Sequence, residues 1–117
     1  MAEGVVQLSS LRGERLTSVR FGEDFVEFEF GEQAIRALAG VAFHARGFQI
    51  SSADSGSRDA FCSLIGDSVA EIDLTSHAVF NVVFRSGARL SIPIEQAHRA
   101  GLEAMQYMKY GRLVVAW

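Results

Sequence analysis

The stretches LSSLRGERLTSVRF (residues 8–21) and FCSLIGDSVAEIDL (residues 61–74) show the same pattern of apolar residues and glycine, 53 residues apart. In each stretch a short helical turn is predicted to end at a glycine, Gly13 or Gly66, because glycine readily adopts the left-handed conformation that closes a helix. The next apolar residues are spaced apolar-x-x-apolar-x-apolar, which indicates a strand with a bulged or bent entry. The matching pairs are Leu8 and Phe61, Leu11 and Leu64, Leu16 and Val69, Val19 and Ile72, and Phe21 and Leu74.

The only matching pair of titratable residue types in the repeated stretches is an acid, Glu14 in the first stretch and Asp67 in the second. Each acid directly follows the predicted glycine stop, where a solvated turn residue is expected. We therefore interpret the repeat as a duplicated fold and not as a duplicated active site.

Strands are predicted after each copy of the repeat. Residues 23–30 and 77–84 alternate with a period of two, which is typical of strands with one buried face. A glycine-containing turn follows each of them, and a third strand is expected at 34–45 in the first copy and at 88–94 in the second. The inward stripes are Val26, Phe28 and Phe30, then Ile35, Ala37, Ala39, Val41 and Phe43 in copy one, and Phe80, Val82 and Phe84, then Ala88, Leu90, Ile92 and Ile94 in copy two.

The C-terminal stretch allows two interpretations. A helix over 95–109 is favoured by composition, although Gly101 lies in its middle and costs about 1 kcal/mol relative to alanine. The alternative is a loop at 95–102 followed by a hairpin, and residues 112–117 form a strand in either case. The fold class predicted is mainly β (α+β): one domain of two repeats, about 5–52 and 58–117, joined by a polar loop at 51–59. The antiparallel units are expected to form a sandwich or partly open barrel with one C-terminal helix.

Composition narrows the function classes. The 117 residues have a formal charge of −3, and ten arginines and one lysine are interspersed with the acids, so no basic stripe favours nucleic-acid binding. Cys62 is the single cysteine, which disfavours a disulfide or a zinc cage. The first ten residues lack the pattern of a signal peptide, and no apolar run reaches the ~20 residues that span a bilayer. We expect a cytoplasmic protein that does not bind membranes.

A ligand site is conceivable where the two copies meet. His44 and His98 occupy related positions, and two histidines near a pseudo-two-fold axis would offer acid–base or metal chemistry. The polar loop adds Asp54 and Asp59 as ligand-binding candidates. The competing interpretation is that the histidines are solvated or satisfied and the loop is a linker with a helix cap. No metal or cofactor is predicted.

Large apolar side chains near the C-terminus indicate either plain core packing or an interface. The large apolar side chains near the C-terminus are more numerous than one helix face can bury. Two valines on the outer face of the strand at 77–84 would also be exposed to solvent unless another segment or subunit packed on them. Aromatic residues and methionine are enriched at protein interfaces, so we expect a homo-oligomer, as a dimer, or one protein partner. The candidate interface residues are Val79, Val83, Met105, Tyr107, Met108 and Trp117.

The second copy carries the patterns S-L-I-G-x-x-V-x-x-I and V-F-x-V-x-F-x-S-G-x-x-L-x-I over residues 63–92, followed by G-L-E-A and V-V-A-W within 101–117. In these patterns the chain is similar to small bacterial domains of unknown function. Some of those domains occur in toxin–immunity settings, and this resemblance implies a protein-binding role. The shared motifs are structural, so the resemblance carries no functional residue over to this chain.

Two functional hypotheses follow from the sequence. The first is a non-catalytic protein-interaction module that self-associates or binds one protein partner, because no catalytic motif is present and apolar groups lack a cover. The alternative is a small-ligand or metal-binding domain with its pocket between the two repeats. An enzyme ranks third, because it would require a perturbed titratable group in a concave site.

Overall fold

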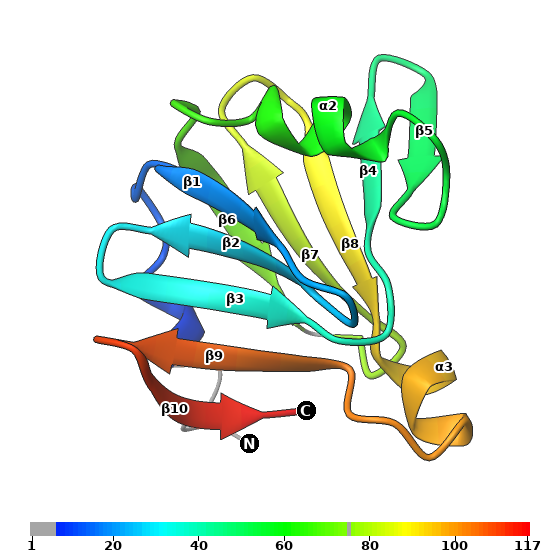
Figure 1. The fold of residues 1–117 in the computed structure, drawn as a ribbon. Helices are drawn as coiled ribbons and strands as arrows, with labels where there is room; N and C mark the ends of the chain where they lie inside the picture. The colour runs from blue at the N-terminus through cyan, green and yellow to red at the C-terminus, as the bar shows by residue number, and fades with distance from the viewer. Residues whose placement is uncertain (1–6, 75) are drawn as a thin grey trace.

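Two antiparallel sheets of five strands each build the molecule and face one another across a common core (Figure 1). The computed structural model describes residues 7–74 and 76–117. The first sheet has the order β1-β2-β3-β9-β10 and the second the order β5-β4-β8-β7-β6. The strands are β1 (Ser18–Phe21), β2 (Val26–Phe30), β3 (Gln33–Ala37), β4 (Ala42–Ala45), β5 (Phe48–Ser51), β6 (Val69–Asp73), β7 (Val79–Phe84), β8 (Arg89–Pro93), β9 (Met105–Lys109) and β10 (Arg112–Ala116). The mainly β fold class predicted from the sequence is confirmed.

The two copies of the repeated stretch pair with each other. Four backbone hydrogen bonds of 2.8–2.9 Å join residues 13–16 to residues 66–69. The amide of Gly13 donates to the carbonyl of Val69, and the amide of Gly66 donates in the same way to Leu16. This reciprocal pattern is the signature of a two-fold relation between the copies. The predicted start of the first repeat at residue 5 lies outside the described residues.

Each sheet takes strands from both halves of the chain. The first sheet contains β1, β2 and β3 from the first half and is completed by β9 and β10 from the second. The second sheet contains β6, β7 and β8 and is completed by β4 and β5. The β4–β5 and β9–β10 hairpins have therefore changed places between the two sheets.

The prediction of one continuous strand at 34–45 is wrong. β3 ends at Ala37, and the chain then crosses to the other sheet, where β4 begins at Ala42. Gly40 lies in this crossing with φ of 122°, a backbone conformation that side-chain-bearing residues rarely adopt. The alternation continues across the break because both strands face the same core, which buries Val41 and Phe43.

The prediction of a helix over 95–109 is also wrong, and the alternative hairpin is present. Helix α3 spans only Ile94–Arg99. The amides of Gly101 and Leu102 then donate to the carbonyls of His98 and Ala97, an arrangement that ends a helix at a left-handed glycine. The chain continues into β9 and β10 instead.

A second helix, α2 (Ser57–Cys62), lies against strands of both sheets and supplies the core residue Phe61. The aromatic rings of the core connect the layers, since Phe30 of β2 stacks on Phe84 of β7 and Phe28 meets Phe61 edge to face. Phe28, Phe30, Phe80, Val82 and Phe84 are buried, as the period-two patterns predicted. Within the described ranges, no helix has the length and apolar character required to cross a membrane.

Candidate functional site: two equivalent hairpins with different surfaces

The β4–β5 and β9–β10 hairpins occupy the same position in their respective sheets. Phe43 of β4 pairs with Leu90 of β8, and Tyr107 of β9 pairs with Ile35 of β3. All four of these side chains point into the core. The outward-facing neighbours of these pairs are therefore also equivalent, so that His44 and Arg89 in one sheet correspond to Met108 and Ala34 in the other.

Both hairpins close through a two-residue turn in the left-handed region. Arg46 and Gly47 have φ of 48° and 79°, and Tyr110 and Gly111 have φ of 53° and 76°. Two successive positive φ angles give the turn a twist that matches paired strands, and asparagine or glycine is the usual first residue. Arg46 and Tyr110 are the two non-glycine residues with positive φ in the described part of the chain. Each turn thus holds a large side chain at a position that disfavours one.

The β4–β5 hairpin presents a basic surface. One cross-strand row on the outer face of the second sheet runs through Gln49, His44, Arg89, Val83 and Glu71. The first four of these residues line a pocket of about 390 Å³, together with residues of the hairpin turn. Burial lowers the pKa of His44 from its ordinary value of 6.5, and the positive charge of Arg89 lowers this pKa further.

The β9–β10 hairpin presents an apolar surface instead. Tyr110, Leu113 and Val114 are 66%, 55% and 41% exposed, although large apolar side chains usually avoid water. Leu113 pairs with Met108, and Met108 pairs with Ala34, so the three form a cross-strand row on the outer face of the first sheet. We call the five residues Ala34, Met108, Tyr110, Leu113 and Val114 the apolar hairpin patch.

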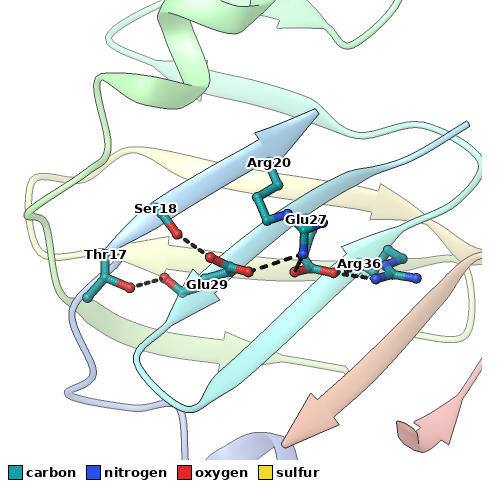
Figure 2. Close-up of polar contacts among 6 residues, drawn as sticks. All are labelled: Thr17, Ser18, Arg20, Glu27, Glu29 and Arg36. Atoms are coloured by element: carbon teal, nitrogen blue, oxygen red, sulfur yellow. Dashed lines mark hydrogen bonds and ion pairs between the residues drawn. The ribbon is translucent and has the colours of Figure 1, made fainter. Parts of the chain in front are cut away.

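A charged ladder borders this patch on the outer face of the same sheet (Figure 2). Glu27 lies between Arg20 and Arg36, at 3.3 Å and 2.7 Å from their guanidinium nitrogens. The guanidinium of Arg36 also lies 4.5 Å from the centre of the Phe25 ring. As a result Glu27 is only 3% exposed, although it belongs to an outward-facing strand position. Its charge is paired, as burial requires.

Glu29 extends the ladder towards the edge strand β1. Its carboxylate accepts a hydrogen bond from the Ser18 hydroxyl, and the Thr17 hydroxyl donates to its carbonyl oxygen at 2.9 Å. Hydrogen bonding to the Glu27 carboxyl lowers the pKa of Glu29, and Ser18 and Arg20 lower this pKa further. Two arginines and two glutamates thus satisfy one another, so the ladder forms a polar border that needs no external partner.

The structure does not bring the four predicted ligand residues together. His44 pairs with Arg89 at the start of β8, whereas His98 belongs to α3, which follows the end of β8. A strand of this length separates them by roughly 15 Å at 3.3 Å per residue. The Asp54 carboxylate accepts the amide of Ser51 within its own turn, and Asp59 lies in the first turn of α2.

A cleft of about 750 Å³ lies between the β1–β2 turn and α2, and it is lined by none of these four residues. Among residues 7–74 and 76–117, no three histidine, cysteine, aspartate or glutamate side chains gather as a metal site requires.

The predicted interface residues divide into three groups. Met105 and Tyr107 are buried in the core, and the Tyr107 hydroxyl donates to the Gln33 side-chain oxygen at 2.6 Å. Trp117 packs partly against the same core. Val79 and Val83 lie on the outer face of the second sheet. Met108 alone belongs to the apolar hairpin patch.

Sequence reasoning missed Arg46, Arg89, Leu113 and Val114. The Arg-Gly and Tyr-Gly pairs are visible in the sequence as candidate turns. The pairing of β4 with β8 and of β3 with β9 is not visible, because it joins segments far apart in the chain.

Comparison of the chain with models of known protein families, with curated proteins and with solved structures finds no match. The surface chemistry of the two hairpins is therefore the basis for assigning a function.

Proposed function

We propose that this protein is a non-catalytic interaction module that self-associates through the apolar hairpin patch. The supporting observation is the concentration of exposed apolar side chains in one hairpin. Six large apolar side chains of the described residues are exposed, and three of them lie within residues 110–114. Exposed apolar clusters with a polar border are typical of protein–protein contact sites.

The patch suits a second copy of the same chain because its two ends carry opposite charge. Lys109 and Arg112 lie at the turn end of the hairpin. Glu103 lies at the opposite end, where the neighbouring Ala104 amide donates to the Trp117 carbonyl. In a two-fold dimer whose axis is perpendicular to the hairpin strands, the copies run in opposite directions, so the basic end of one patch meets the acidic end of the other while the apolar residues meet in the middle.

The contact is expected to use side chains rather than an extended backbone ladder. β10 is an edge strand, but its pairing with β9 shifts register between Leu113 and Val115, which marks a bulge. Bulges at sheet edges disturb regular pairing with another strand. We therefore place the partner on the outer face, over Met108, Leu113 and Val114.

The test compares Leu113→Asp with Ile65→Asp by native mass spectrometry and analytical ultracentrifugation. Ile65 is a matched control because it is 46% exposed and lies outside the patch. The wild type and Ile65→Asp are expected to be dimers, and Leu113→Asp is expected to be a folded monomer, because a charge buried in an apolar contact is unpaired. A wild type that stays monomeric at all concentrations, or a dimer that survives Leu113→Asp, would contradict the proposal.

A second candidate function, binding of a small ligand, is favoured by the pocket at the β4–β5 hairpin.

A further inference from the structure

The outer face of the second sheet holds a basic pocket that the self-association described above does not use. Nine residues line it, of which three are basic and none is acidic, although the chain as a whole has a charge of −3. The basic residues are His44, Arg46 and Arg89. An acid-free lining of this kind repels cations and attracts anions.

Within the described part of the chain, no acid pairs with either arginine of the pocket. Among the described residues, ion pairs engage Arg12, Arg20, Arg36 and Arg99, whereas none engages Arg46 or Arg89. The nearest acid in the same cross-strand row is Glu71, which lies beyond Val83 and pairs with Arg12 at 2.9 Å. The guanidinium groups are therefore free to donate to a ligand.

The fold places these charges together at a cost. His44 and Arg89 are directly opposite one another on neighbouring strands, where like charges repel. Arg46 occupies the left-handed turn position that asparagine or glycine would fill without strain. Backbone strain and like-charge contacts that other residues would avoid are common features of binding sites.

We propose that the pocket formed by His44, Arg46, Gln49 and Arg89 binds a small anion that presents carboxylate or phosphate oxygens. The two guanidinium groups supply charged donors, and the Gln49 amide and the His44 ring supply two further donors. Phe48 also lines the pocket, although its ring packs edge to face on the ring of the core residue Phe43 at 6.2 Å. The open shape suits a single charged group, either as a free ion or as the end of a larger molecule.

Binding should be linked to the protonation of His44. The groups that face His44 are Gln49 from β5 and Arg89 from β8, with Val83 of β7 beyond Arg89. A bound anion offsets the repulsion from Arg89 and favours the protonated ring. By analogy with other charge pairs, we expect the pKa of His44 to rise on saturation. Affinity would then be higher below this pKa than above it.

The experiment is a histidine-selective NMR titration of the whole protein with sodium phosphate and, separately, with sodium acetate at constant ionic strength. The chain has three histidines, so His77 and His98 serve as internal controls in the same spectrum. We expect His44 alone to shift saturably and its pKa to rise. A response to phosphate alone assigns a phosphate site, a response to acetate alone assigns a carboxylate site, and a response to both assigns a general anion site. Absence of a saturable response to either would overturn the proposal.

Variants test whether the titration response arises from the pocket or from surface charge in general. Arg89→Gln and Arg46→Gln should each abolish the response, whereas Arg15→Gln, at an exposed arginine outside the pocket, should leave it intact. Thermal unfolding of each variant establishes that it is folded before titration. An unchanged response in Arg46→Gln and Arg89→Gln, or equal shifts of all three histidines, would also overturn the proposal. Because the patch and the pocket lie on different sheets, failure here leaves the self-association test unaffected.

Discussion

The β4–β5 and β9–β10 hairpins share their left-handed turns and their place beside the third strand of a sheet, yet they display different chemistry. Where one sheet has His44 beside Arg89, the other has Met108 beside Ala34. Where one turn presents Arg46, the other presents Tyr110. The comparison shows that the inward residues preserve the fold while the outward residues of the same strands are free to differ. The residues that determine function are therefore expected among the outward-facing side chains of these strands.

The largest expected effect concerns the inward residues that the hairpins share. Tyr107→Ala should reduce the free energy of unfolding by about 3–5 kcal/mol, the usual cost of removing a buried aromatic ring. Phe43→Ala should cost less, because Phe43 is slightly exposed and lacks the hydrogen bond that Tyr107 makes to Gln33. Urea denaturation of both variants measures the difference. A larger loss for Phe43→Ala would break the proposed equivalence of the two core positions.

The turns provide the next test. An added Cβ atom would meet no atom within 4 Å at either Gly47 or Gly111, so strain in the left-handed backbone is the main cost of substitution. Gly47→Ala and Gly111→Ala should each destabilise the protein by about 1–2 kcal/mol. Equal losses in chemical denaturation would support matching turns, and a variant that loses no stability would show that its turn adopts another conformation.

A smaller effect of the opposite sign is expected at the first turn position. Arg46→Asn and Tyr110→Asn should each stabilise the protein, by up to about 1 kcal/mol, because asparagine tolerates the left-handed region better. Arg46→Asn should also weaken the response to anions, and Tyr110→Asn should weaken self-association. A variant that is more stable but binds less would show that the native turn retains a strained backbone because its side chain is needed for binding. Destabilisation of the protein by either variant would contradict that interpretation.

The smallest effect is a dependence of stability on pH. Because the pKa of His44 is lowered in the folded chain, the unfolded chain binds this proton more readily. Stability should therefore decline as the pH falls from above 6.5 towards the lowered pKa, and no further contribution from this group is expected below it. His44→Met, which introduces the residue of the equivalent position, should remove this part of the dependence. Thermal midpoints of both proteins above and below pH 6.5 provide the comparison.

Much of the fold was predictable because it depends on local pattern. The glycine stops at 13 and 66 and the alternation in β2 and β7 are visible in the sequence and agree with the structure. The alternation over 34–45 was misleading, because a strand that changes sheets within a sandwich can keep its inward residues in phase. Gly40 was the local sign of the break.

The C-terminal hairpin was predicted only as an alternative. Composition favoured a helix, whereas the two-residue spacing of Met105 and Tyr107, both buried, is the signal of a strand. The surfaces were less accessible to prediction. The basic pocket depends on Arg89 lying opposite His44, and the apolar patch depends on Leu113 lying beside Met108, so each required the strand register.

Because the two hairpins are exchanged between the sheets, neither sheet can be completed during synthesis from the first half of the chain alone. When the first half leaves the ribosome, β3 has no neighbour on one side, and β4 and β5 have no sheet to join. The first sheet gains its last strands only when residues 105–116 have been made. Contacts between such distant segments slow folding and leave strand edges open in the meantime. The growing chain therefore depends on a hairpin that is made after all strands of the second sheet to close the sheet that was begun first.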